Sequence, residues 1–142
     1  KDVQKIENKT ESKENFSGRI LVAEDNPNNQ LLIKIILQKL GLDVTIVENG
    51  QLAVEKYQSE NFDLVFLDIN MPIMDGLTAL KHIRAYEKDI QKYTPIIALT
   101  ANSINGDRER YIDEGMDNYL SKPFDRNQLI AILHLYINKN EY

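Results

Sequence analysis

No cysteine occurs among the 142 residues, and histidine occurs only as His82 and His134. Without cysteine the chain cannot hold a disulfide framework, a thiol nucleophile, or a zinc or iron–sulfur site with cysteine ligands. The two histidines lie too far apart in the sequence to form a local metal-binding motif. The absence of cysteine also fits a reducing compartment. We therefore expect a cytoplasmic domain, and membrane anchoring of a longer parent chain stays open.

Long hydrophobic runs are also absent. The most apolar segment, residues 31–40, is interrupted by Lys34, Gln38 and Lys39, and it falls well short of the ~20 residues that span a bilayer. The amino-terminal segment lacks the apolar stretch of a secretory signal peptide. We therefore expect no membrane contact by this part of the protein.

Positive charge is in the minority, with 17 Lys and Arg against 22 Asp and Glu and a formal net charge of −5. Such a chain lacks the positive field that drives non-specific binding to nucleic acid. No glycine-rich nucleotide-binding loop occurs either, which excludes ATP binding by a P-loop. The hydrophobic content of 42% and the charged content of 27% are typical of a globular protein,, and the length indicates one domain.

The amino-terminal segment differs in composition from the rest of the chain. Residues 1–16 contain four lysines and four acids, and only Val3, Ile6 and Phe16 could enter a core. So few apolar side chains cannot offset the entropy lost on ordering the segment. We predict that residues 1–17 form a charged, flexible linker or tail and that residues 18–142 form the domain. Lysines at every fourth position leave a helical extension as the alternative.

From residue 19 onward, short apolar runs alternate with helix-like segments. The runs comprise residues 20–23, 44–47, 64–67, 96–99 and 119–120. Asn26 and Pro27 are typical of a helix start, and Gly41 is typical of a helix end. Because the runs are continuously apolar, we expect strands that are buried on both faces. The sequence therefore predicts an α/β fold, with a doubly wound five-stranded parallel sheet flanked by five helices.

Polar residues stand where the predicted strands end. These are Glu24 and Asp25, Asp68, Thr100, and Ser121 with Lys122. Ligands of open parallel sheets bind beyond the carboxyl ends of the strands. Clustered carboxylates repel each other unless a cation lies between them, and an all-oxygen set favours Mg²⁺.

Each of these residues alone is more typical of a helix cap or a solvated side chain. Together they favour phosphoryl transfer, because an aspartate can accept a phosphoryl group and an ammonium and a hydroxyl can stabilise its charge.

Four motifs carry a family resemblance: residues 24–26, 68–76 and 98–101, and Lys122-Pro123. Together they resemble the receiver (response-regulator) domain of two-component signalling, which has a flavodoxin-like fold. The resemblance covers about residues 18–139, and its motifs stand in the family's order. The sequences of residues 24–29, 98–102 and 115–123 are most similar to those of receivers of hybrid sensor histidine kinases.

The resemblance implies a role for each acid at the strand ends. Asp68 would be the phosphoacceptor, taking a phosphoryl group from a phosphohistidine of a partner. Asp25, Asp68 and the backbone carbonyl of Asn70 would bind Mg²⁺, and Glu24 would act through water.

It also implies roles for the remaining residues. Lys122 would pair with the phosphoryl group, and its bond to Pro123 would be cis. Thr100 would move to hydrogen-bond the phosphoryl group, and Tyr119 would turn inward with it as the second switch residue.

The implied partners are a histidine kinase dimerisation domain or a histidine phosphotransfer domain, docking near residues 28–32 on the first helix. The domain would not itself be a kinase. It would assist the phosphorylation and dephosphorylation of its own aspartate, as a monomer or weak dimer within a hybrid sensor histidine kinase. A start at Lys1 fits a piece of such a chain. The alternatives are a free-standing single-domain response regulator and a non-catalytic interaction module with the receiver fold.

Overall fold

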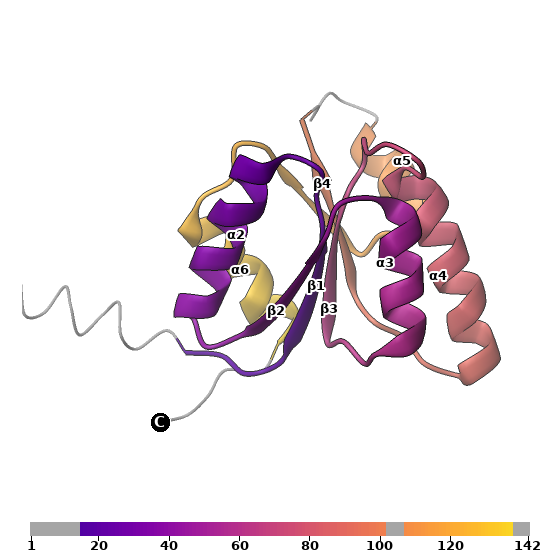
Figure 1. Ribbon diagram of the computed structural model, residues 1–142, viewed down its shortest axis with the longest axis horizontal. Helices are drawn as coiled ribbons and strands as arrows, with labels where there is room; N and C mark the ends of the chain where they lie inside the picture. The colour runs from indigo at the N-terminus through magenta and orange to yellow at the C-terminus, as the bar shows by residue number, and fades with distance from the viewer. Residues whose placement is uncertain (1–14, 102–106, 138–142) are drawn as a thin grey trace, which may run out of the picture.

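The computed structural model describes residues 15–101 and 107–137. Within these ranges five strands alternate with five helices: β1 (Arg19–Ala23), α2 (Pro27–Lys39), β2 (Asp43–Val47), α3 (Gly50–Ser59), β3 (Leu64–Asp68), α4 (Gly76–Ile90), β4 (Ile96–Thr100), α5 (Asp107–Glu114), β5 (Asn118–Ser121) and α6 (Arg126–Tyr136). The strands form one parallel sheet in the order β2-β1-β3-β4-β5. Helices α2 and α6 cover one face of the sheet, and α3, α4 and α5 cover the other (Figure 1). The predicted doubly wound α/β fold is confirmed. None of the described helices is both long enough and apolar enough to cross a membrane.

The two helical layers enclose two hydrophobic cores because successive strand residues point to opposite faces. Phe66 of β3 and Ile97 of β4 face α2 and α6. Their chain neighbours Val65 and Ala98 face α3, α4 and α5. All residues of β3 and β4 are buried, which explains why each strand is apolar up to its last residue, Asp68 or Thr100.

Helix α2 has the boundaries that its sequence predicts. The Asn26 side chain accepts hydrogen bonds from the backbone N–H groups of Asn28 and Asn29, at 2.9 Å and 3.2 Å, and Pro27 occupies the first helical position. Gly41 lies just beyond the helix end with φ of +98°. A side chain at Gly41 would also collide with the backbone, since an added Cβ would lie 2.5 Å from the Phe16 carbonyl oxygen.

The packed part of the chain begins before the predicted boundary at residue 18. Phe16 is fully buried in the core beneath α2 and α6. Its N–H donates to the Leu40 carbonyl at 2.7 Å, and its ring meets His134 edge-on at 5.3 Å between centroids. Residue 16, which the composition assigns to the linker, is therefore packed into the domain. The remainder of the predicted linker, residues 1–14, lies outside the described residues.

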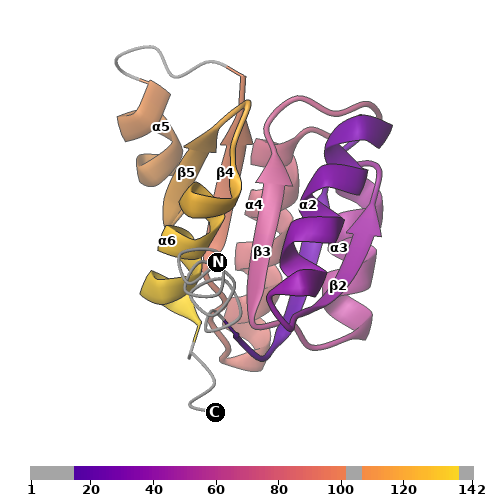
Figure 2. The ribbon, with the colours of Figure 1, turned by 90° about the vertical axis from the view of Figure 1, so that its left-hand side faces the viewer.

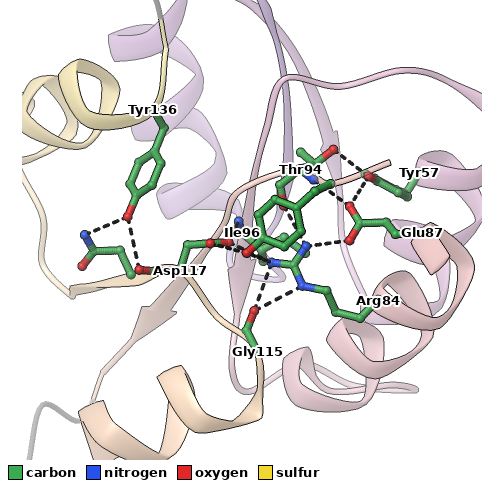
Figure 3. Close-up of polar contacts among 10 residues, drawn as sticks. Tyr57, Arg84, Glu87, Thr94, Ile96, Gly115, Asp117 and Tyr136 are labelled. Atoms are coloured by element: carbon green, nitrogen blue, oxygen red, sulfur yellow. Dashed lines mark hydrogen bonds and ion pairs between the residues drawn. The ribbon is translucent and has the colours of Figure 1, made fainter. Parts of the chain in front are cut away.

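A buried polar cluster joins α3 and α4 to the segments that precede β4 and β5 (Figure 3). Its centre is Arg84 of α4, whose guanidinium donates to Glu87 at 2.7 Å and to Asp117 at 2.8 Å. Arg84 also donates to the carbonyl oxygens of Thr94 at 2.8 Å and Gly115 at 3.0 Å. Since Thr94 precedes β4 and Gly115 precedes β5, this cluster lies at the amino edge of the sheet, opposite the predicted site.

Glu87 has further partners in the cluster. Its Oε2 accepts hydrogen bonds from the Tyr57 hydroxyl at 2.5 Å and from the Thr94 N–H at 2.8 Å. Burial and the hydrogen bond to Glu87 raise the pKa of Tyr57 far above its usual value,. The phenol therefore stays neutral and serves as a donor to the carboxylate.

Candidate functional site

Three of the predicted site residues meet at the carboxyl edge of the sheet, toward which all five strands run (Figure 2). One carboxylate oxygen from each of Glu24, Asp25 and Asp68 lies within 4.8 Å of the others. Glu24 is fully buried and Asp68 is 4% exposed, whereas Asp25 is exposed to solvent. The site therefore combines two buried acids with one at its mouth.

Lys122 supplies a positive charge to this cluster from the segment after β5. Its Nζ lies 2.8 Å from Glu24 Oε1 and 2.8 Å from Asp68 Oδ2. The Lys122–Pro123 peptide bond is cis. Three carboxylates and one ammonium leave a net charge of −2 when all are ionised. A divalent cation matches this charge, and the all-oxygen donor set fits Mg²⁺ rather than a softer metal.

The cluster lines an open cleft of about 470 Å³ at the ends of β1, β3, β4 and β5. Asn70, which follows β3, shares this cleft, and its N–H donates to Asp68 Oδ1 at 3.2 Å. The complete lining comprises Glu24, Asp25, Asn26, Pro27, Asn29, Asp68, Asn70, Ala101 and Lys122. The cleft gives the Asp68 carboxylate a route to solutes although little of its surface is exposed.

Two supporting contacts hold Glu24 in place. The Asn26 N–H donates to Glu24 Oε2 at 3.0 Å. The Gln30 side chain, from the first turn of α2, donates to the Glu24 backbone carbonyl at 2.5 Å. The acid motif does not reveal the role of Gln30, since the glutamine becomes a neighbour of Glu24 only when α2 turns back over the end of β1.

Gly76 permits the close approach of α4 to Asp68. A Cβ at this position would lie 2.2 Å from the backbone carbonyl oxygen of Asp68. Any larger residue would push the start of α4 away from the end of β3. The glycine of the 68–76 motif therefore has a steric role beneath the site.

Burial raises the pKa of the Asp68 carboxyl to about 6, and the charge of Glu24 adds to this shift, whereas the hydrogen bond from Lys122 opposes it,. Burial acts to lower the pKa of the Lys122 ammonium, but its hydrogen bonds to Asp68 and Glu24 outweigh burial, so its pKa lies above the usual value. At neutral pH both groups are mostly charged. The site thus holds an ionised, desolvated carboxylate beside a permanent cation.

This raised pKa predicts a pH-dependent stability in metal-free protein. Because the folded state binds the Asp68 proton more tightly than the unfolded state, the contribution of Asp68 to stability falls as pH rises from about 4 through about 6,. We expect Asp68→Asn, which cannot ionise, to become more stable than wild type by about 1–2 kcal/mol at pH 8, with the difference vanishing near pH 4. Urea unfolding in EDTA across this pH range measures the difference. A constant difference, or one that grows toward acid pH, would contradict the assignment.

The two predicted switch residues lie beside the acid cluster rather than within it. Thr100 ends β4 and is 2% exposed, and its hydroxyl lies 3.4 Å from the Tyr111 hydroxyl of α5. Tyr119 of β5 is half-buried, and the Arg108 guanidinium lies 4.8 Å from the centre of its ring. Both switch residues therefore contact α5.

Comparison with known proteins agrees with this geometry. The model of the response regulator receiver domain family matches residues 20–134. The chain is 40% identical over 126 residues to hybrid signal transduction histidine kinase I of Dictyostelium discoideum, with 85% of the chain and 7% of that protein covered. The chain spans between 4% and 15% of the length of the curated relatives that it matches.

Solved structures resemble the fold closely. One is the receiver domain of the sensor histidine kinase PA1611 from Pseudomonas aeruginosa, which has a magnesium ion coordinated in its active-site cleft. It has a TM-score of 0.76 and 42% identity, with 84% of this chain and 97% of that chain covered. Another is the receiver domain of the Saccharomyces cerevisiae response regulator Ssk1, in a co-crystal structure with the histidine phosphotransfer protein Ypd1. That match has a TM-score of 0.79 and 28% identity, with 85% and 89% of the chains covered.

Proposed function

Because the chain belongs to the response regulator receiver domain family, we propose that Asp68 is its phosphoacceptor. The observation that carries the proposal is the ion pair of Asp68 with Lys122 at 2.8 Å, inside an open cleft with two further acids. An Asp68 oxygen attacks the phosphorus of a partner's phosphohistidine, and the P–N bond breaks as the new P–O bond forms. The electron pair of the broken bond returns to the imidazole nitrogen, and the product is an acyl phosphate.

The chain's own residues prepare Asp68 for this step. Lys122 contacts one carboxylate oxygen, Oδ2, and the Asn70 N–H contacts the other, Oδ1. These contacts orient the carboxylate toward the cleft while its burial excludes bulk water. The Lys122 ammonium also lies close enough to balance charge on an incoming phosphoryl group.

The clustered carboxylates of Glu24, Asp25 and Asp68 would hold Mg²⁺,. We assign the backbone carbonyl of Asn70, which lines the same cleft, as a further ligand. The ion would neutralise charge on the phosphoryl oxygens. Asp25 stands at the exposed side of this set, and Glu24 lies at its base. Thr100 lies at the end of the neighbouring strand β4, next to the strand that ends in Asp68. We assign its hydroxyl to hydrogen bonding with the phosphoryl group once Asp68 is modified.

The same proposal covers the context of the domain. The similarity to a hybrid histidine kinase favours a receiver within such a kinase. As part of the same proposal we assign it to the cytoplasm and expect a monomer or weak dimer. Helix α2 begins beside the cleft and exposes Leu31, Leu32 and Ile35, which are 59%, 42% and 43% exposed. Exposed apolar side chains on the helix that begins at the cleft suit the docking of a histidine phosphotransfer domain or a kinase dimerisation domain.

The test is phosphorylation with a small donor such as phosphoramidate. We expect the wild-type protein to gain one phosphoryl group, dependent on Mg²⁺ and released by hydroxylamine as an acyl phosphate is. Asp68→Asn should gain none, because an amide oxygen is a poor nucleophile toward phosphorus. Asp125→Asn is the matched control, since Asp125 is an exposed helix cap that does not line the cleft and asparagine caps equally well,. Intact-protein mass spectrometry measures the gain.

This experiment also separates the phosphoacceptor from the interaction module. If wild type gains no Mg²⁺-dependent acyl phosphate, or if Asp68→Asn gains as much as wild type, the proposed function is wrong. The interaction module with a receiver fold would then be the better interpretation.

A further inference from the structure

Helix α5 contacts both proposed switch residues through side chains that lie one turn apart. Tyr111 and Arg108 are separated by three positions, so they share one face of the helix,. Tyr111 reaches the Thr100 hydroxyl at 3.4 Å, and Arg108 covers the ring of Tyr119 at 4.8 Å. Tyr111 is only 5% exposed, so its hydroxyl group is held inside the protein at this contact.

The strand geometry explains why α5 meets both residues. Ile96 and Ala98 of β4 face the core beneath α3, α4 and α5, and Thr100 follows in the same alternating row. Tyr119 packs against the same core and pairs in register with Ala98. The Thr100 hydroxyl therefore faces α5 in this conformation. To reach a phosphoryl group on Asp68 it must turn from Tyr111 toward the cleft.

We propose that Tyr111 and Arg108 are positioning residues that hold the switch in its unphosphorylated arrangement. Tyr111 retains the Thr100 hydroxyl on the α5 side, and Arg108 retains the Tyr119 ring beneath the helix. This rests on the proposed phosphoacceptor function, whose site it regulates. Phosphorylation must break the Tyr111–Thr100 contact before Thr100 can bind the phosphoryl group. The free energy of that contact therefore weakens binding of any phosphoryl group that recruits Thr100.

The test uses beryllofluoride with Mg²⁺, a stable mimic of the aspartyl phosphate, and the full chain. We expect Tyr111→Phe to bind beryllofluoride about two- to fivefold more tightly than wild type, since one long neutral hydrogen bond no longer opposes the switch. Arg108→Met should also tighten binding, by about twofold, through release of the Tyr119 ring. Isothermal titration calorimetry measures both affinities.

Tyr136→Phe is the matched control. It removes the same group from a tyrosine whose hydroxyl donates to the Asp117 carbonyl and accepts from the Asn118 side-chain amide, before and at the start of β5. Its beryllofluoride affinity should equal that of wild type. Because phenylalanine fills the space of the tyrosine ring, Tyr111→Phe should unfold within a few degrees of wild type when metal-free.

The outcomes separate the two proposals. If wild type binds beryllofluoride and Tyr111→Phe binds it with the same or weaker affinity, the positioning role is wrong while the phosphoacceptor function stands. If Tyr136→Phe tightens binding as much as Tyr111→Phe does, the effect is general loosening and the role is again wrong. If wild type does not bind beryllofluoride at all, both proposals fail.

Discussion

Arg84→Met is expected to lower the free energy of unfolding by about 3–5 kcal/mol, as loss of one partner from a buried ion pair does. The Arg84 side chain is 16% exposed, and its partners Glu87 and Asp117 are 3% and 18% exposed. Methionine preserves much of the apolar stem but leaves both carboxylates without their guanidinium. The Thr94 and Gly115 carbonyl groups also lose a donor. The effect is large because all four acceptors lose a donor at once, and the remaining donors to Glu87 and Asp117 are neutral.

Lys81→Met provides the control on the same helix. Lys81 joins α4 to Glu114 of α5, but this contact is 3.7 Å long and the Lys81 side chain is 68% exposed. An exposed pair of this kind contributes at most about 1 kcal/mol. Urea unfolding at pH 7 measures the free energy of unfolding of both variants. Equal slopes of this free energy against urea concentration would indicate that both expose the same surface area on unfolding. Equal losses in the two variants would show that Arg84 acts only as a surface charge.

The centre of the candidate site could be predicted from the sequence. The strand-ending positions of Glu24, Asp25, Asp68 and Lys122 follow from short apolar runs that stop at polar residues. A parallel sheet brings all such ends to one edge. The structure places these residues together, so local patterns and one topological rule were sufficient for the centre of the site.

Contacts between residues far apart in the chain were not predictable in this way. Arg84 and Glu87 lie one turn apart on a helix, a spacing equally typical of a solvent-exposed pair. Only the arrival of Asp117 and Thr94 from other segments makes the pair buried. Phe16 likewise stands alone in a charged segment, and its burial depends on α2 and α6.

Tyr111 illustrates a third limit. It is the buried residue of the mostly polar helix α5. Nothing in the local sequence indicates that its hydroxyl contacts Thr100, because that contact depends on where α5 packs along the length of β4. Side-chain contacts of this kind require the packed structure.

Lys122→Met is expected to destabilise metal-free protein by about 3 kcal/mol at pH 8, because two buried carboxylates lose their shared cation. Glu24 is fully buried and Asp68 is 6% exposed at its side chain, and Lys122 Nζ lies 2.8 Å from each. The Asp68 pKa, already raised to about 6 by burial, should rise further when the ammonium is gone. The folded variant then takes up protons that the unfolded chain does not bind. The loss of stability of Lys122→Met relative to wild type should therefore shrink as pH falls through the raised pKa toward 5.

Urea unfolding of Lys122→Met and wild type in EDTA, at pH 5 and pH 8, measures this change. Saturating Mg²⁺ should also restore stability at pH 8, since a cation that binds only the folded state stabilises it. Lys56→Met is the control, because Lys56 is 42% exposed and pairs with Glu60 on the surface at 3.0 Å, so its loss should stay below about 1 kcal/mol at both pH values. A Lys122→Met deficit that persists at pH 5 would indicate lost packing. No deficit at pH 8 would show that the two acids do not need this lysine. The predicted pattern ties the stability of the metal-free fold to the charges around Asp68, the proposed phosphoacceptor.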